Sequence, residues 1–506
     1  MRELVELFFK QKTIVNHHIA SYNDFIPTYD NPHSRMQRIV DNVRVGSEEP
    51  ERGVIKLDVE DKNITIRMGQ IRVGHPIIKE ANGASHRSTP MECRLRNVNY
   101  SAPIYLDFVV SIDGVEDEPE TVRIGYLPIM VKSKLCNLHR ENISDKEDLT
   151  DEEYRELLIK EGEDPNDLGG YFISGGTERS LVTLEDLAPN QVMVESEEKN
   201  GRIVEVAKVY SQKEGFRALT KVEKGKNGIL MVSIPTVSGT VPVVVLMKAL
   251  GMESDKDIYD AIVSDPRMEN IVKANIEECV LGKKSKKKMG INTTEEALLY
   301  LERQFAAGQA KEYREKKVNS ILDRAFLPHL GDQPEDRLKK AIFLGRIARS
   351  VLERAIGLRR DDDKDHYANK RVKLAGDLME NLFRVGFTSL IKDLKYQLER
   401  SYVRTKEVKI SSAIRPDVLT QKMNHALATG NWVGGRNGVS QLLDRTSNMS
   451  TLSHLRRVVS PLTRTQPHFE ARDLHPTQWG RLCPNETPEG QNCGLVKNLA
   501  LIVDIS

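Results

Sequence analysis

The segment from residue 430 to 500 holds the densest set of hydrogen-bonding side chains in the sequence. It contains both tryptophans of the chain, and its glycines and prolines recur too often for long regular elements. Arginine greatly outnumbers lysine there, and planar guanidinium groups suit phosphates and hydrogen-bonded networks. Loops that present arginines and amides could therefore follow a nucleic-acid backbone. The interleaved polar residues are Gln441, Asp444, Arg445, His454, Arg456, Arg457, Arg464, Arg472, His475, Glu486 and Asn492.

The same arginines could instead bridge to carboxylates inside the protein. Acidic side chains lie close by at Asp444, Glu470, Asp473, Glu486 and Glu489. Arginine and carboxylate groups form strong two-pronged hydrogen bonds. We therefore expect both uses, with some arginines in internal bridges and others available to a phosphate.

The run "RRDDDKDHYANKR" permits two interpretations. Its carboxylates and histidine could hold hard cations, as in a metal-dependent nuclease. Alternatively, it is a solvated connection between two helices, with charges balanced by neighbouring bases. We favour the connection, because adjacent like charges without supporting groups rarely make a catalytic site. The acidic candidates are Asp361, Asp362, Asp363, Asp365 and His366, and the bases are Arg359, Arg360, Lys364, Lys370 and Arg371.

The run "GKKSKKK" at 282–288 is the most basic short block of the chain. It could lie along phosphates, which would make binding depend on salt. It could equally be a solvated loop tip, since it contains no aromatic residue for base stacking. The possible phosphate contacts are Lys283, Lys284, Lys286, Lys287 and Lys288.

Length and composition bound the class of protein. The chain of 506 residues is long enough for about three domains. Its 75 basic and 74 acidic side chains give a net charge of +1, so nucleic-acid binding must come from local patches. The five cysteines lack a close CxxC pair and the N-terminus lacks a secretion signal, which predicts a cytoplasmic location. No nucleotide-binding loop, zinc spacing or membrane-length apolar stretch occurs.

Strand and helix patterns alternate in blocks, which predicts an α+β multidomain fold. Apolar residues alternate with period two over 50–135 and again from about 200. Helical spacing takes over at 143–164 and at 243–330. Two amphipathic helices follow, with inward faces expected at Leu344, Ile347, Ala348, Val351, Leu352 and Ala355, and at Leu374, Leu378, Leu382 and Val385.

Two shorter patterns predict local structure. "LVELFFKQK" near the N-terminus predicts a helix packed on something larger. In "YFISGGTERS", the pair Gly175 and Gly176 predicts a tight hairpin, because glycine readily adopts positive φ.

Several motifs together resemble a known family. "GGYFISGGTER", "LPIMVKSKLC", "DDDKDHYANKRVKLAG", "GVSQLLDRTSNMSTLSHLRRVVSPL" and "LHPTQWGRLCPNETPEGQNCGLVKNLAL" follow one another along the chain. They resemble successive landmarks of the second-largest subunit of multisubunit RNA polymerases. The archaeal and eukaryotic version fits, since a bacterial beta subunit would have a basic residue in place of Leu455. In some archaea this subunit is encoded as two polypeptides, and the sequence resembles the N-terminal one, B double-prime.

The resemblance implies a domain organisation. It predicts an external segment, a protrusion made of two separated parts, a lobe inserted between them, and a fork. The expected bounds are 1–29 for the external segment, 30–195 and 360–425 for the protrusion, 196–359 for the lobe, 426–498 for the fork, and 499–506 for the start of the next region.

The resemblance also implies template-directed RNA synthesis from nucleoside triphosphates, with Mg²⁺ held mainly by the largest subunit. No catalytic residue and no metal ligand is expected in this chain, whose role would be to position nucleic acids and help separate strands. The expected partners are the complementary C-terminal half, B prime, the largest-subunit chains, the smaller subunits, initiation factors, template DNA and nascent RNA. The alternatives are a nuclease that uses Asp361, Asp362, Asp363 and His366, or a pure assembly scaffold.

Specific contacts follow from the positions of the family's motifs. Residues 460–469 match fork loop 2, which borders downstream DNA in the family, and "VGGRN" stands in place of a longer fork loop 1. The residues expected near downstream DNA are Arg464, Thr465 and His468. Those expected on the hybrid and RNA side are Gln441, Asp444, Arg445, His454, Arg456, Arg457, Glu486 and Asn492.

Overall fold

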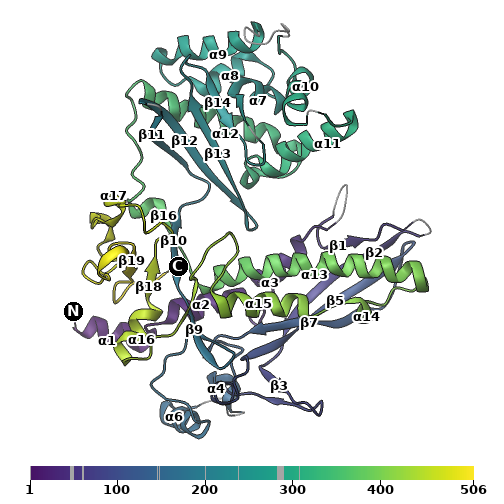
Figure 1. The fold of residues 1–506 in the computed structure, drawn as a ribbon, viewed down its shortest axis with the longest axis vertical. Helices are drawn as coiled ribbons and strands as arrows, with labels where there is room; N and C mark the ends of the chain where they lie inside the picture. Colours follow the sequence, from purple (N-terminus) through teal and green to yellow (C-terminus); the bar gives the residue numbers. More distant parts are fainter. Residues whose placement is uncertain are drawn as a thin grey trace. The chain divides into compact units, whose positions relative to one another are not determined.

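A computed structural model of the chain combines helices and several separate β-sheets, so the predicted α+β multidomain class is confirmed. The chain divides into two compact units (Figure 1). Unit 1 comprises Met1–Asp186 and Arg371–Ser506, and unit 2 comprises Leu187–Lys370. The structure describes residues 2–45, 51–59, 62–144, 146, 149–199, 201–237, 239–281, 290–306 and 308–505.

The largest sheet of unit 1 is antiparallel, as the period-two patterns predict. Strand β2 pairs with β5 from Ile64↔Ile112 to Val73↔Ile104, and β5 also pairs with β7. Alternate side chains of β2 are buried, because successive residues of a strand point to opposite faces. The strands are β1 (Val54–Lys56), β2 (Ile64–Val73), β5 (Ser101–Ile112), β6 (Val115–Glu116) and β7 (Glu120–Pro128); a separate hairpin is formed by β3 (Ile77–Lys79) and β4 (Ser85–Arg87).

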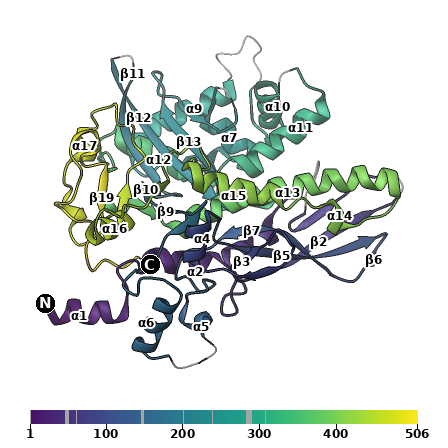
Figure 2. The same ribbon diagram turned by 60° about the horizontal axis from the view of Figure 1, so that its bottom comes forward.

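A long helix, α13, forms the centre of the unit 1 core together with α2 and α15 (Figure 2). The predicted inward residues Leu378 and Leu382 are buried, while Val385 is only partly buried. A Cβ added at Gly386 would lie 2.7 Å from Leu419 Cδ1, so glycine permits the close approach of α13 and α15. The helices of unit 1 are α1 (Arg2–Gln11), α2 (Asn16–Phe25), α3 (Arg35–Asn42), α4 (Pro90–Arg96), α5 (Arg140–Ile143), α6 (Asp151–Lys160), α13 (Ala375–Thr405), α14 (Ile410–Ala413), α15 (Asp417–Thr429), α16 (Asn448–Leu455) and α17 (Phe469–Arg472).

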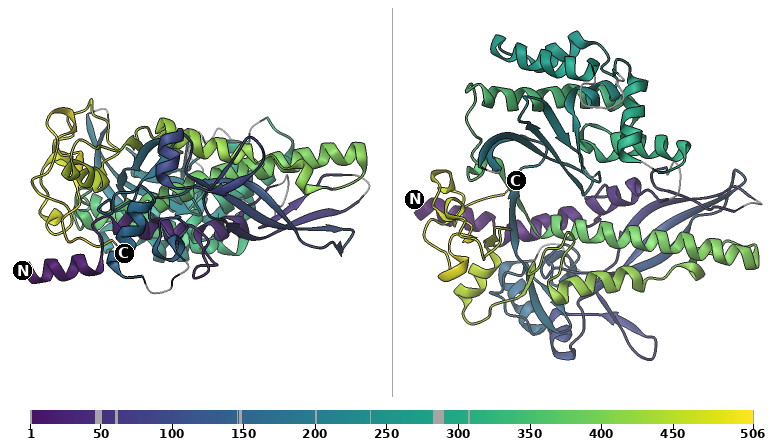
Figure 3. Two further views of the ribbon diagram at one scale, coloured as in Figure 1. Left: turned by 90° about the horizontal axis from the view of Figure 1, so that it is seen from below. Right: turned by 45° about the horizontal axis from the view of Figure 1, so that its top comes forward.

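The structure forms both the hairpin and the N-terminal helix that the short sequence patterns predict. The predicted hairpin is confirmed, since Gly175 (φ 56°) and Gly176 (φ 75°) connect two paired strands. The predicted N-terminal helix forms as α1, but Leu4 and Leu7 are 63% and 58% exposed. These two side chains are not covered within the described chain, so the expectation that the helix packs on something larger stays a prediction; Figure 3 shows α1 projecting from unit 1.

Unit 2 packs one helix across a five-stranded antiparallel sheet. The helix is α12, in which Leu344, Ile347, Ala348, Val351 and Leu352 are buried as predicted, whereas Ala355 is partly exposed. The strands are β11 (Val192–Lys199), β12 (Arg202–Lys213), β13 (Phe216–Lys224), β14 (Leu230–Ser233) and β15 (Thr240–Pro242). The helices are α7 (Val243–Ala249), α8 (Asp255–Ile262), α9 (Glu269–Leu281), α10 (Thr294–Phe305), α11 (Lys311–Ser320) and α12 (Arg337–Ala355).

Candidate nucleic-acid interface

Two small sheets of unit 1 hold the polar segment at 441–498. One contains a parallel pair, in which Val458 lies opposite Thr183 and Val459 opposite Leu184. Between Val459 and Val496 the chain runs in loops and short helices, seen in yellow in Figure 2. The first sheet has the order β16 (Lys370–Lys373), β10 (Thr183–Leu187), β18 (Arg457–Val459) and β19 (Val496–Asn498); the second has the order β17 (Ser440–Leu442), β9 (Thr177–Leu181) and β8 (Phe172–Ser174).

Gln441, Asp444 and His454 form one hydrogen-bonded group. The Asp444 backbone N–H donates to His454 Nδ1 at 3.1 Å, so the ring proton lies on Nε2 and donates to Gln441 Oε1 at 3.0 Å. Burial, aided by the nearby Arg457 charge, lowers the pKa of His454 to about 4. The ring is therefore neutral and fixes the orientation of the Gln441 amide.

The loop after Asp444 is closed by its own side chains. Asp444 Oδ1 accepts from the Thr446 backbone N–H at 2.9 Å and from Ser450 Oγ at 3.2 Å. These bonds lower the pKa of Asp444, with the Thr446 bond as the first cause. Ser447 caps helix α16 by accepting from the Ser450 N–H, so the helix begins where the loop ends.

Arg445 and Arg456 are held by the protein itself. Arg445 Nε donates to Glu178 Oε2 at 2.6 Å, and its Nη2 donates to Asp167 Oδ2 at 2.9 Å. Arg456 is buried and donates to the carbonyl oxygens of Ile14, Ala500 and Leu501. The expectation that Arg456 contacts a nucleic acid is therefore wrong, because its guanidinium joins backbone segments in the interior.

Arg457 differs from its neighbour Arg456. It is the first residue of β18, its side chain is half-buried, and the structure gives its guanidinium no hydrogen bond or ion pair with another described residue. The exposed Glu486 accepts from Ser453 Oγ at 2.5 Å, and Asn498 Nδ2 donates to the same hydroxyl at 3.0 Å. Arg457 therefore has no described partner for its charge, whereas Arg456 is fully engaged in the interior.

The loop at 460–469 is stabilised through arginines. Arg464 Nε donates to Asn492 Oδ1 at 3.2 Å and its Nη1 donates to the Ser460 carbonyl at 3.0 Å. Burial and the charge of Arg472 lower the pKa of Arg464. Thr465 is exposed, and His468 has a φ of 42° and lies 3.3 Å from Thr463 Oγ1 through its Nε2. The sequence assigned Arg464 to the downstream DNA and Asn492 to the RNA side, and the structure joins the two residues by a hydrogen bond.

The acidic joint at 361–366 has partners that explain it without a metal. Asp361 bonds Arg354 Nε at 2.6 Å and Ser196 Oγ at 3.0 Å, and Arg354 lowers the pKa of this carboxyl. Asp362 accepts from the Val194 N–H and from Arg359, both at 2.7 Å.

The remaining acidic groups of the joint are also engaged. Asp363 Oδ1 accepts from the Asp365 and His366 N–H groups, and Asp365 pairs with Lys370 at 3.2 Å. The nuclease alternative that used Asp361, Asp362, Asp363 and His366 is wrong, because ion pairs and turn hydrogen bonds hold these side chains apart as a connector. No set of metal-ligand spacing occurs among the described residues of the joint.

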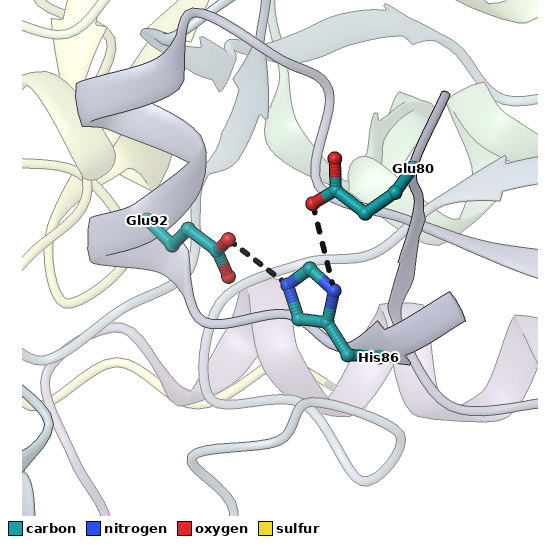
Figure 4. A group of neighbouring side chains, drawn as sticks. All are labelled: Glu80, His86 and Glu92. Atoms are coloured by element: carbon teal, nitrogen blue, oxygen red, sulfur yellow. Dashed lines mark hydrogen bonds and ion pairs between the residues drawn. The ribbon is translucent and has the colours of Figure 1, made fainter. Parts of the chain in front are cut away.

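One group among the described residues does have ligand spacing (Figure 4). His86 Nε2 lies 3.0 Å from Glu92 Oε1, and its Nδ1 lies 3.7 Å from Glu80 Oε1. The Arg96 guanidinium donates to Glu80 at 2.7 Å and to Glu92 at 2.8 Å, and it lowers the pKa of Glu80. A cation therefore already neutralises both carboxylates, and the group does not fit a magnesium site.

The remaining points concern the lysine run, two cysteines and membrane-spanning helices. The lysine run Lys283–Lys288 lies outside the described residues. Cys483 is partly buried and Cys493 is exposed, and neither belongs to a group of ligand spacing in the described chain. Within that same part, every helix is too short or too polar to cross a membrane.

Sequence comparisons decide the family. Residues 13–421 match the family model described as RNA polymerase beta subunit, and residues 441–505 match RNA polymerase Rpb2, domain 3. The chain belongs to the RNA polymerase beta-subunit family. It is a subunit of a DNA-directed RNA polymerase, a nucleotidyltransferase.

Similar relatives come from archaea, and this chain covers nearly all of some of them but less than half of others. DNA-directed RNA polymerase subunit Rpo2N of Methanococcus vannielii is 48% identical over 509 residues, covering 100% of this chain and 95% of the relative. The Rpo2N subunit of Methanocaldococcus jannaschii is 48% identical with the same coverage. Subunit Rpo2 of Saccharolobus solfataricus is 45% identical over 99% of this chain, but the match covers only 41% of that longer relative.

The structure adds site residues that the sequence did not single out. Glu178 and Asp167 bind Arg445, Glu163 binds Arg94, and Lys497 forms a buried pair with Glu185 at 2.9 Å. These acids lie far from residues 441–498 in sequence. The only signal for Glu178 was its place in "GGYFISGGTER", one of the family motifs.

Proposed function

We propose that this polymerase subunit forms one side of the active-centre cleft and positions template DNA and nascent RNA. The observation that supports this most directly is the contrast between Arg456 and Arg457. Arg456 holds the interior together, while Arg457 is half-buried and has no described partner for its charge. A guanidinium placed in this way can bind an RNA phosphate without breaking a structural bond.

The Gln441 amide and the Arg457 guanidinium make a joint RNA-side surface in this proposal. His454 is neutral at physiological pH because its pKa is about 4, so it orients Gln441 without adding charge. Asp444, Glu486 and Asn492 support the surrounding loops through Thr446, Ser453 and Arg464. We assign Arg464, Thr465 and His468, which lie on one loop, to the downstream DNA edge.

We infer that the chain works as the N-terminal half of a divided second-largest subunit, the part termed B double-prime. Support comes from the relatives, since the chain covers 95% of an Rpo2N subunit and 41% of an undivided Rpo2 subunit. Its partners would be the complementary half B prime, the largest-subunit chains, the smaller subunits and initiation factors, in the cytoplasm. The domain names protrusion, lobe and fork, and a lysine-run contact with phosphate, stay predictions.

Magnesium would be held by other chains. In the acidic joint and in the Glu80–His86–Glu92 group, the described carboxylates are engaged with arginines, lysines or backbone N–H groups. When bound, the ions would stabilise the attacking and leaving oxygens of nucleotidyl transfer. This subunit's residues would act by positioning RNA and DNA.

The test is reassembly of the polymerase with and without this chain. A complete assembly given template, Mg²⁺ and nucleotides should make RNA, while the assembly lacking the chain should not. RNA carrying a photo-crosslinking nucleotide near its 3′ end should attach to the 441–457 segment. Active enzyme with no such crosslink would leave only the scaffold role.

A further inference from the structure

Arg445 lies at the centre of a charged network inside unit 1. Its Nε donates to Glu178 Oε2 at 2.6 Å and its Nη2 donates to Glu178 Oε1 at 3.0 Å and to Asp167 Oδ2 at 2.9 Å. The guanidinium carbon lies 5.0 Å from the centre of the Tyr171 ring, and Tyr171 Oη donates to Asp167 at 2.7 Å. Although burial opposes its charge, the bond to Glu178 raises the pKa of Arg445, so the side chain is always a cation.

A second arginine extends the network to the rest of unit 1. Arg94 donates to Glu178 at 2.8 Å and to both oxygens of Glu163 at 3.0 and 2.9 Å. Its Nη2 also donates to the Tyr171 hydroxyl at 2.8 Å. Three carboxylates therefore share two guanidinium groups, with the Lys132 ammonium donating to the Asp167 carbonyl.

This balance makes Arg445 hard to replace. Without it, the three carboxylates would keep one guanidinium, and the side chains of Glu163, Asp167 and Glu178 are only 6%, 13% and 17% exposed. Carboxylates that are largely removed from water strongly disfavour an uncompensated charge. The loop that carries Arg445 would move to relieve the repulsion.

That loop leads directly to the proposed RNA-side surface. Glu178 also accepts the Leu443 N–H through its carbonyl at 3.0 Å, so one residue holds both the backbone and the side chain of the segment. Between Leu443 and Arg445, the Asp444 N–H donates to His454, and the His454 ring donates to Gln441. A shift at Arg445 would therefore reach the Gln441 amide through two hydrogen bonds.

We propose that Arg445 is a positioning residue for RNA synthesis: by binding Glu178 and Asp167 it holds the 441–447 segment where the transcript passes. Arg445 does not contact RNA in this account, which replaces its predicted role as a nucleic-acid ligand. The inference rests on the proposed function, because it requires that this segment faces RNA.

The experiment uses reassembled polymerase with Arg445→Ala, Arg445→Lys or the matched control Arg415→Ala. Arg415 also bonds a carboxylate in unit 1, but on helix α13 at Asp393. The readout is the ratio of short released RNA to long RNA. Arg445→Ala should raise this ratio several-fold, within the roughly 100-fold range that a displacement of about 1 Å can cause.

The conservative variant separates positioning from loss of folding. Arg445→Lys restores the charge but not the two-pronged geometry, so its ratio should lie between wild type and Arg445→Ala. Adding Glu178→Gln to Arg445→Ala should bring the ratio part of the way back toward wild type, because it removes one of the uncompensated carboxylate charges. If Arg445→Ala does not assemble, the graded effect of Arg445→Lys still carries the test.

Two results would overturn the inference in different ways. Arg445→Lys with a wild-type product ratio, or an equal change in Arg415→Ala, would show that Arg445 does not position the segment. Crosslinks from RNA that reach 441–457 equally well in wild type and Arg445→Ala would also overturn it while the proposed function stands. Absence of those crosslinks in wild type would instead remove the proposed function.

Discussion

The acidic joint at 361–366 and the polar segment at 441–498 contain similar charged side chains but use them differently. In the joint, Asp361 and Asp362 are paired with Arg354 and Arg359 close in sequence. In the segment at 441–498, Arg445 binds a carboxylate 267 residues away, and Arg456 donates to a carbonyl 442 residues away. Residue types suggest where chemistry could occur, but the partners decide whether a side chain is available.

The acidic joint and the buried histidines of unit 1 should respond differently to acid, and this is the largest effect that we expect. Burial lowers the pKa of His18 and of His454 to about 4 and also lowers that of His17, all in unit 1. The unfolded chain binds these protons below about pH 6.5, so stability is complete above that pH and is lost as pH falls toward about 4. Each pKa unit corresponds to about 1.4 kcal/mol.

The joint should not share this loss. Its bond to Arg354 lowers the pKa of Asp361, so the stability from that pair is lost only as pH falls below the ordinary carboxyl range. Hydrogen exchange at pH 7 and pH 5 in the full chain should show opening of segments around His18 and His454 but not around 354–366. Equal opening of both regions would contradict the assignment, and His18→Gln should reduce the acid effect.

The next prediction separates the adjacent arginines Arg456 and Arg457. Replacing Arg456 by alanine leaves three carbonyl acceptors without their buried donor and should cost about 3 kcal/mol. Replacing Arg457 should change stability by no more than about 0.5 kcal/mol. Chemical unfolding of both variants measures this difference, and equal losses would remove the distinction on which the proposed site rests.

The next prediction concerns the effect of Arg457 on RNA synthesis. Arg457→Ala in reassembled polymerase should increase abortive release several-fold, because one charged phosphate contact is worth roughly 1.5–3 kcal/mol. The length distribution of RNA products provides the measurement. An unchanged distribution would count against contact between Arg457 and RNA.

The smallest effect is expected in the joint. Asp361→Ala removes a pair that is partly exposed and should cost no more than about 1 kcal/mol. Magnesium-dependent RNA synthesis by the reassembled enzyme should be unchanged. A large loss of synthesis with normal assembly would revive a metal role for this segment.

Local patterns predicted local structure well. The strands over 50–135, the Gly175–Gly176 hairpin and the buried face of α12 follow from periodicity and glycine conformations within a few residues. The site was less predictable, because Arg456 and Arg457 are adjacent and chemically identical. Only distant partners such as Ile14 and Leu501 distinguish them, and a single sequence does not pair such segments.

The central claim is tested most directly by crosslinking RNA to this chain in the reassembled, active polymerase. The transcript should carry 4-thiouridine at its 3′ end, and attachment sites on the chain should be mapped by mass spectrometry. We predict adducts within 441–457, fewer adducts in Arg457→Ala, and none in 361–366. Adducts concentrated in the acidic joint, with 441–457 unmarked, would contradict the account.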